Sequence, residues 1–170
     1  MPRTLLQTLP FLLGLWLALA LLLPFAAVGG SESSSEIAAL ETHLFDGANR
    51  IRDQHRRITL VRSPELDRVA RAHSADMAAR GYLAHENPEG ENPLDRIERG
   101  GISGFSLAAE NAGSTSRRDP VREILEGWQL SPAHRRNLLA PAFNTTGVGT
   151  ARATDGTLYF TQLYVTFARE

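Results

Sequence analysis

Histidine and glutamate side chains are the residues here that could perform acid–base or metal chemistry, and His85, Glu110 and His134 stand out by position. His85 lies in a loop just past an expected helix end, where binding and catalytic residues are common. His134 follows Ser131-Pro132 in a first helical turn, whose positive end favours a neutral imidazole suited to metal ligation or hydrogen bonding. Glu110 stands between small residues, either as part of a site or as a structural acceptor for backbone donors. Spacing alone leaves open whether the three share one site.

The remaining candidates have simpler interpretations. His43 and His55 lie among charged residues of an expected helix, so we predict surface positions for both. His73 lies on the apolar stripe of the next helix, which predicts a buried or half-buried structural histidine. A nucleophilic role for Ser131 is disfavoured, because its position before Pro132 suits a helix cap and no oxyanion-hole motif accompanies it.

Composition excludes several classes of protein. The chain has no cysteine, which removes thiolate nucleophiles and thiolate metal sites, and the fold must be stabilised without disulfides. Lys and Arg number 18 against 19 Asp and Glu, so nothing in the charge balance indicates nucleic acid as a partner.

The first 30 residues predict export. A weakly basic Met1–Thr4 precedes the uncharged, Leu- and Ala-rich segment Leu5–Val28, which has the anatomy of a signal peptide. The segment is also long enough for an uncleaved membrane anchor of roughly 20 residues. Either alternative places the rest of the chain outside the cytoplasm, in the extracellular space or the cell envelope. Residues 31–36 are predicted to be a polar linker, and residues 37–170 a single domain.

Helices are expected to position most of the candidate residues. Apolar residues recur at three- and four-residue steps from Ile37 to Ile51. Three cap-plus-proline pairs predict helix starts: Ser63-Pro64, Asp119-Pro120 and Ser131-Pro132. The first of these helices ends at Gly81, and a loop-rich middle (82–115) follows, with a short helix expected at Pro93–Arg99.

The C-terminal part predicts a β-hairpin. Residues 146–153 and 157–167 are rich in Val, Thr, Tyr and Phe, and Asp155-Gly156 between them is typical of a hairpin turn. Helices followed by a terminal hairpin favour an α+β domain, with helices packed on a small antiparallel sheet.

Several stretches in order along the chain resemble motifs of the CAP superfamily (cysteine-rich secretory proteins, antigen 5 and plant pathogenesis-related proteins; the SCP domain), particularly its cysteine-free bacterial branch. They are Asn49-x-x-Arg52, Leu66-x-x-x-Ala70-x-x-His73-x-x-x-Met77-x-x-x-Gly81-Tyr82-x-x-His85, Pro93-x-Asp95-Arg96, Ala109-Glu110-Asn111, Gly127-Trp128-x-x-Ser131-Pro132-x-His134-Arg135-x-Asn137-Leu138-Leu139, Gly147-Val148-Gly149 and Tyr159-x-Thr161-Gln162-Leu163. The run from Gly127 to Leu139 is the most specific of these. The resemblance covers about residues 40 to 167.

The resemblance implies a fold and a site. The fold is a three-layer α-β-α sandwich with a central cleft lined by two histidines and two acidic residues. His85 and His134 match the two histidines, and Glu110 matches the first glutamate. The position of the second glutamate holds Ser131 here, which puts a complete set of four in doubt. Three ligands with an open fourth position would suit zinc better than calcium.

Other residues are expected to support the cleft. Glu123 and Glu126, on the helix before Ser131, are candidates to replace the missing glutamate. Asn137 and Gln162 are expected either to orient the cleft histidines or to make ordinary structural hydrogen bonds.

Three functions follow from these observations. The first is a non-enzymatic module in the extracellular space or cell envelope. Its cleft binds a metal ion or small ligand, and the module engages an unidentified envelope or extracellular partner as a monomer. The second is a metal-dependent hydrolase with Glu110 as base and His85 and His134 as ligands, although no compact His-Glu-x-x-His motif is present. The third is a lipid- or sterol-binding protein, for which Phe105 is the one candidate aromatic in the 101–105 region.

Overall fold

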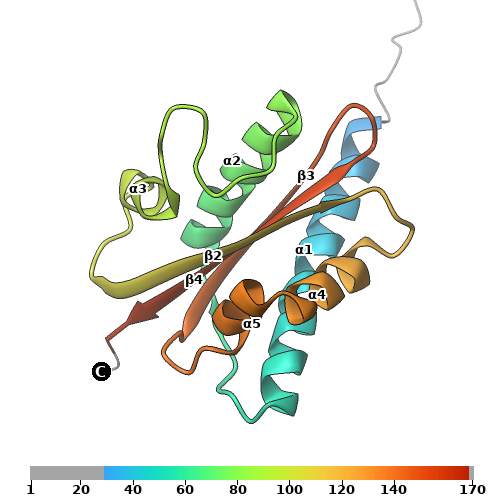
Figure 1. Ribbon diagram of the computed structural model, residues 1–170. Helices are drawn as coiled ribbons and strands as arrows, with labels where there is room; N and C mark the ends of the chain where they lie inside the picture. Colours follow the sequence, from blue (N-terminus) through green and yellow to red (C-terminus); the bar gives the residue numbers. More distant parts are fainter. Residues whose placement is uncertain (1–28, 169–170) are drawn as a thin grey trace, which may run out of the picture.

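The computed structural model describes residues 29–168, and within them helices that begin at proline organise the fold (Figure 1). The elements in chain order are α1 (Gly29–Gln54), β1 (Val61–Arg62), α2 (Pro64–Arg80), α3 (Pro93–Arg99), β2 (Phe105–Thr115), α4 (Pro120–Leu130), α5 (Pro132–Leu139), β3 (Thr145–Arg152) and β4 (Leu158–Phe167). Proline suits the first helical position because its fixed φ is already helical and its missing N–H has no partner there. Each predicted cap-plus-proline pair therefore marks a helix start, and the short helix Pro93–Arg99 is confirmed.

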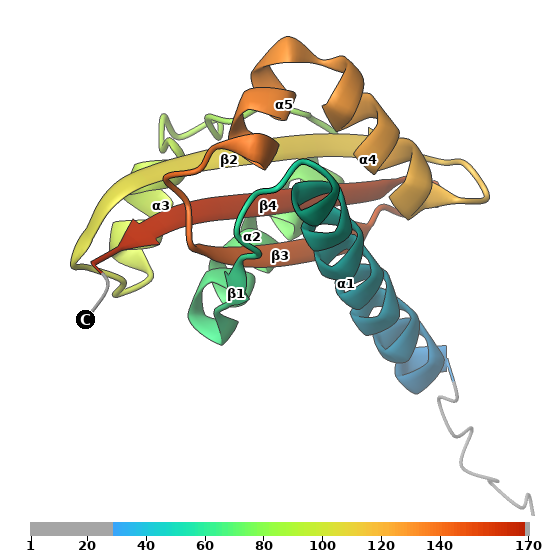
Figure 2. The same ribbon diagram turned by 90° about the horizontal axis from the view of Figure 1, so that it is seen from below.

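The sheet has four strands in the order β1-β3-β4-β2 (Figure 2). The predicted hairpin is confirmed as the antiparallel pair β3 and β4. Strand β2 pairs antiparallel with β4 and forms one edge, and the two-residue β1 pairs parallel with β3 at the other. The sequence predicts only loop and a short helix for residues 82–115, so the prediction missed strand β2. Its alanine, glycine and asparagine residues have low strand propensity, and pairing with β4 overrides it.

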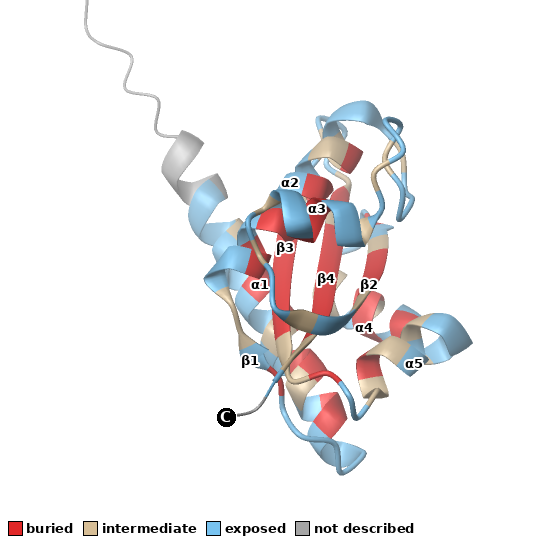
Figure 3. Cartoon of the chain, turned by 90° about the vertical axis from the view of Figure 1, so that its left-hand side faces the viewer, coloured by how far each residue is buried: buried red, intermediate tan, exposed pale blue. Residues whose placement is uncertain are grey.

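Helices cover both faces of the sheet, which confirms the expected three-layer sandwich (Figure 1). Helices α1, α4 and α5 pack on one face around Leu44, Trp128 and Phe160. Helices α2 and α3 pack on the other face around Leu66, Ile97 and other buried residues. Burial is greatest along the two central strands, as Figure 3 shows.

Glycines in β3 allow α2 to lie directly against the sheet. A Cβ atom at Gly147 or Gly149 would meet the backbone of α2 well inside 3.0 Å. The Gly147-Val148-Gly149 motif is therefore a requirement of helix–sheet packing, and α2 carries Asp67, whose Oδ1 accepts from the Val148 N–H at 2.7 Å.

Arg52 connects the end of α1 to the segment that follows α5. The side chain is fully buried, and its guanidinium donates to the backbone carbonyls of Ile58, Leu138, Ala140 and Phe143 at 2.8 to 3.2 Å. These bonds fix where α5 lies, and with it His134.

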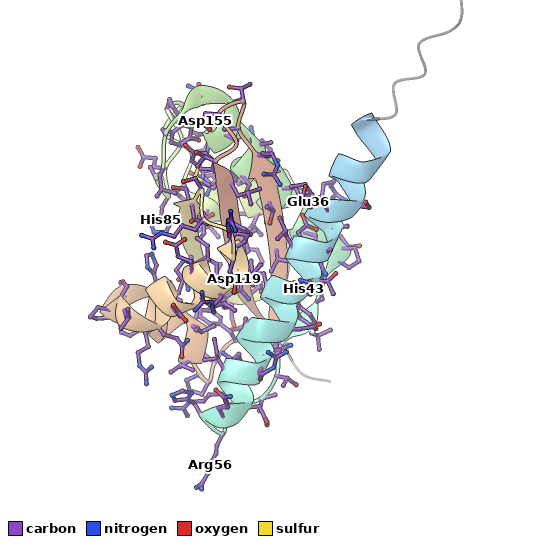
Figure 4. The ribbon with its side chains drawn as sticks, turned by 90° about the vertical axis from the view of Figure 1, so that its right-hand side faces the viewer. Glu36, His43, Arg56, His85, Asp119 and Asp155 are labelled. Atoms are coloured by element: carbon purple, nitrogen blue, oxygen red, sulfur yellow. The ribbon has the colours of Figure 1, made fainter. Side chains whose placement is uncertain are left out.

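Helix α1 begins earlier than the sequence predicts. Residues 31–36, predicted as a linker, belong to the first turns of α1, which extend beyond the sheet (Figure 4). Glu36 forms an ion pair with Arg152 of β3 at 2.6 Å, which ties these turns to the domain. The predicted signal peptide or anchor falls on residues 1–28, outside the described part of the chain. Within residues 29–168, no helix is both long and apolar enough to span a bilayer.

Candidate functional site

Two of the predicted histidines meet at the free edge of β2. His85 lies in the loop after α2, and His134 lies in the first turn of α5 on the other face of the sheet. Their ring centroids are 6.3 Å apart, in an edge-to-face arrangement. The His85 side chain is 51% exposed and lies at the molecular surface in Figure 4. The structure therefore brings His85 and His134 into one solvent-accessible site.

Glu110 is the buried anchor of this site. Its side chain is only 1% exposed, and its Oε1 accepts a hydrogen bond from His85 Nδ1 at 2.8 Å. Its Oε2 accepts from Arg96 Nη2 at 2.7 Å. Arg96 also donates through Nη1 to the backbone carbonyls of His85 and Glu91, so it positions the His85 loop as well as the carboxylate.

His73 is a member of the site that the sequence assigns only to the core. It is buried as predicted, and its Nε2 lies 3.0 Å from the carbonyl oxygen of Ala84 and 3.7 Å from Glu110 Oε1. The sequence gave no signal of this contact, because the contact depends on the loop after Gly81 turning back toward α2. His73 therefore supports the loop that presents His85.

A second set of hydrogen bonds holds His134 from the opposite face of β2. Asn111 Nδ2 donates to the backbone carbonyl of His134 at 3.0 Å and to the Tyr164 hydroxyl at 3.1 Å. Asn137 Nδ2 donates to the Glu110 carbonyl and to Asn111 Oδ1, both at 3.0 Å. Adjacent residues of β2 point to opposite faces. Glu110 and Asn111 thus fix one histidine each.

The other predicted supporting residues lie elsewhere. Gln162 is fully buried and binds Thr146 Oγ1 and the Tyr164 hydroxyl, so it reaches the site only through Tyr164 and Asn111. Ser131 caps α5 by position, but its side chain makes no capping hydrogen bond.

Glu123 and Glu126, the two candidates to replace the second glutamate, contact other residues and neither histidine of the site. Glu123 accepts from the Thr115 hydroxyl and pairs with Arg117 at 2.9 Å. Glu126 lies 3.7 Å from Arg122 and is exposed. The site in this part of the chain therefore contains one carboxylate, Glu110.

Their surroundings shift the pKa values of the two histidines in opposite directions. The hydrogen bond from His85 to Glu110 raises the pKa of His85. Burial, and then the neighbouring charge of His85, lowers the pKa of His134. Desolvation also lowers the pKa of His73. The two shifts are opposite in direction, so His85 keeps its proton to a higher pH than His134 does.

Of the three metal ligands that the sequence predicts, the structure leaves two as candidates, His85 and His134. Because both Glu110 oxygens already accept hydrogen bonds, the carboxylate lies behind His85 and orients it. Over residues 29–168, no group of three or more His, Asp or Glu side chains is arranged to hold a metal ion. His85 Nε2 and the ring nitrogens of His134 have no hydrogen-bond partner among the described residues, so two imidazoles fit a metal whose other ligands come from outside the chain.

Phe105, the candidate aromatic residue for the lipid-binding alternative, packs within the fold. Its ring packs edge-to-face against Phe167 with centroids 6.5 Å apart, beside the cluster beneath α2 and α3. The residue is half-buried, and nothing in its contacts favours a lipid site.

Comparison with known proteins identifies the class of protein. The model of the CAP family, described as the cysteine-rich secretory protein family, matches residues 45–164. The chain belongs to this family, and the structural resemblance agrees: an extracellular SCP-domain protein of Bacillus anthracis is 31% identical with a TM-score of 0.70, covering 81% of this chain and 43% of that one.

Other relatives are similar over the same domain. The uncharacterized protein YkwD of Bacillus subtilis is 31% identical over 119 residues, which is 70% of this chain and 45% of that protein. The uncharacterized membrane protein YlbC of the same organism is 31% identical over 125 residues, 74% of this chain and 34% of that protein. An outer surface protein of Borrelia burgdorferi, 19% identical with a TM-score of 0.70 over 76% of this chain and 94% of that one, shares the fold. The chain spans less than half the length of the two curated relatives.

Proposed function

We propose that this chain is an exported binding module, in which His85 and His134 hold a metal ion or a small ligand and the domain engages a partner outside the cytoplasm. The apolar segment 5–28 supports export, as does the extracellular relative from Bacillus anthracis at 31% identity. We expect the module to act as a monomer.

The engagement of Glu110 is the observation that carries the proposal. A general base needs an oxygen directed at the water or substrate from which it removes a proton. Glu110 is 1% exposed and gives one oxygen to His85 and the other to Arg96. This arrangement favours orientation of a ligand-binding histidine over hydrolysis.

Zinc is the metal that the donor set suits best. Imidazole is a common zinc ligand, and a carboxylate that accepts from the far ring nitrogen fixes the tautomer and raises ligand basicity. His85 and His134 would hold the ion, with Glu110 behind His85 in this role. A bound zinc ion would supply an electrophilic centre for an anionic or carbonyl group of a ligand.

Calorimetric titration of zinc, and then of calcium, into the purified protein tests the proposal. We expect zinc binding with a micromolar or tighter Kd that either His85→Ala or His134→Ala abolishes. His43→Ala is the matched control, because His43 is an exposed histidine on α1. Glu110→Gln should weaken binding by about 10- to 100-fold, as expected for a carboxylate that acts through a ligand.

Two results would contradict the proposal. Zinc binding that is absent, or that is unaffected by both histidine substitutions, would remove the metal site. Chelator-sensitive cleavage of casein that Glu110→Gln abolishes would establish the hydrolase instead.

A further inference from the structure

The outer edge of β2 has no neighbouring strand, because β2 is the last strand in the order β1-β3-β4-β2 (Figure 2). Two of its carbonyls show which residues face outward. Asn137 donates to the Glu110 carbonyl at 3.0 Å, and Trp128 donates to the Ala112 carbonyl at 3.1 Å. In an antiparallel strand, alternate residues direct both backbone groups to the same side. Ala108, two residues before Glu110, therefore faces the same open edge.

Side chains cap only the second half of this edge. Asn137 and Trp128 cover the carbonyls of Glu110 and Ala112. Within residues 29–168, the N–H and C=O of Ala108 and the N–H of Glu110 have no hydrogen-bond partner. Unpaired groups along a strand edge are a template for another extended backbone.

A groove runs along this uncapped half. It has a volume of about 530 Å³ and is lined by residues 105–109 of β2 together with residues at the start of α3. Leu94 of α3 is 42% exposed and Leu107 of β2 is 46% exposed. Figure 3 shows that the first residues of β2 are less buried than those that follow. Glu98 is the one charged residue among those that line the groove.

We propose that this edge binds an extended peptide as an added strand. The peptide backbone would donate to the Ala108 carbonyl and accept from the N–H groups of Ala108 and Glu110. Its alternate side chains would contact Leu94 and Leu107, and Glu98 favours a neutral or basic peptide. The occupant is an extended peptide because backbone amides, rather than side chains, are the unpaired groups at this edge.

The groove places such a peptide next to the histidine site. Its lining ends at Ala109, one residue before Glu110, so a peptide that continues along β2 reaches His85 and His134. Peptide binding rests on the edge of β2 and needs no metal. Removing metal with EDTA should therefore leave the peptide Kd within about twofold, which separates failure of this inference from failure of the proposed function.

A selected peptide provides the probe. Random heptapeptides displayed on phage are selected against the full protein, and the strongest binder is synthesised with acetylated and amidated ends. We expect a micromolar Kd and at least about tenfold slower hydrogen exchange at the amides of Ala108 and Glu110 in the complex. The amide of Ala109, which faces β4, should be unaffected because it is already paired.

Ala108→Pro removes one outward N–H while it leaves the pairing of β2 with β4 intact, as proline is tolerated on a free strand edge. It should weaken the peptide about tenfold, which corresponds to about 1.4 kcal/mol. Ser114→Pro is the matched control, since Ser114 faces the same edge beyond the groove, and its Kd should stay within about twofold. If Ala108→Pro does not fold, the exchange rates of the unmodified protein decide the question.

Three results would overturn the inference. They are the failure of any heptapeptide to be selected, a bound peptide that protects neither Ala108 nor Glu110, and equal affinity for Ala108→Pro. Sedimentation that shows a dimer which Ala108→Pro dissociates would assign the edge to a second copy of this chain.

Discussion

Glu110→Gln is the substitution that tests the structural core of the site most directly. It keeps the size of the side chain and removes its charge. Glu110 is 1% exposed and Arg96 is 4% exposed, so the change leaves a buried guanidinium without its counter-ion. Removing one partner of a buried ion pair costs roughly 3–5 kcal/mol. The glutamine oxygen can still accept from Arg96, which places the expected loss of unfolding free energy near the lower limit, at about 3 kcal/mol.

Thermal and urea unfolding measure this loss. For a domain of this size, about 3 kcal/mol corresponds to a decrease in Tm of roughly 9 °C. Glu123→Gln is the control, because Glu123 also accepts from a hydroxyl and pairs with an arginine, but its side chain is 37% exposed. An exposed pair contributes about 0–1 kcal/mol, so the control should change Tm little.

A double substitution shows whether the unpaired charge is the cause. Adding Arg96→Met to Glu110→Gln removes the uncompensated guanidinium and should restore about 2 kcal/mol. The reasoning is refuted if Glu110→Gln is no more destabilising than Glu123→Gln. It is also refuted if the effects of Glu110→Gln and Arg96→Met simply add, because the pair would then not be coupled.

Three further predictions concern protonation, packing and the position of α5. In an NMR titration, His85 should titrate above the ordinary histidine pKa and His134 below it. Because the folded pKa of His85 is raised, the His85–Glu110 contribution to stability is complete below the unfolded histidine pKa. It is lost as pH rises through the folded pKa of His85. Gly149→Ala should prevent stable folding, since its Cβ would meet the α2 backbone, whereas Gly127→Ala, with open space on α4, should stabilise the protein by about 0.5–1 kcal/mol in urea unfolding. Arg52→Lys should lose part of the guanidinium's set of carbonyl bonds, lower the unfolding free energy by about 3 kcal/mol, and speed hydrogen exchange in α5.

Each of these has a contrary outcome. Equal titration midpoints for His85 and His134 would mean that the Glu110 hydrogen bond does not control the site. A stable Gly149→Ala protein would show that α2 can move away from the sheet. Unchanged exchange in α5 for Arg52→Lys would mean that Arg52 does not position His134.

The sequence by itself predicted the family, the helix starts and the terminal hairpin, because these depend on local signals. Proline fixes φ where a helix begins, and Asp155-Gly156 favours a turn whatever lies nearby. It also predicted that His85, Glu110 and His134 share a site, but only through the ordered motifs of the family. The number of residues between them does not give their distance in space.

The tertiary structure alone decided what those residues do. β2 has weak strand propensity, and its pairing with β4 is what sends Glu110 to one face and Asn111 to the other. The Glu110 carboxylate accepts hydrogen bonds from both His85 and Arg96, and this role depends on three separate segments of the chain. The open edge at Ala108 likewise exists only because β2 is last in the sheet. Local propensity can specify an element, but which groups remain unpaired depends on what packs beside it.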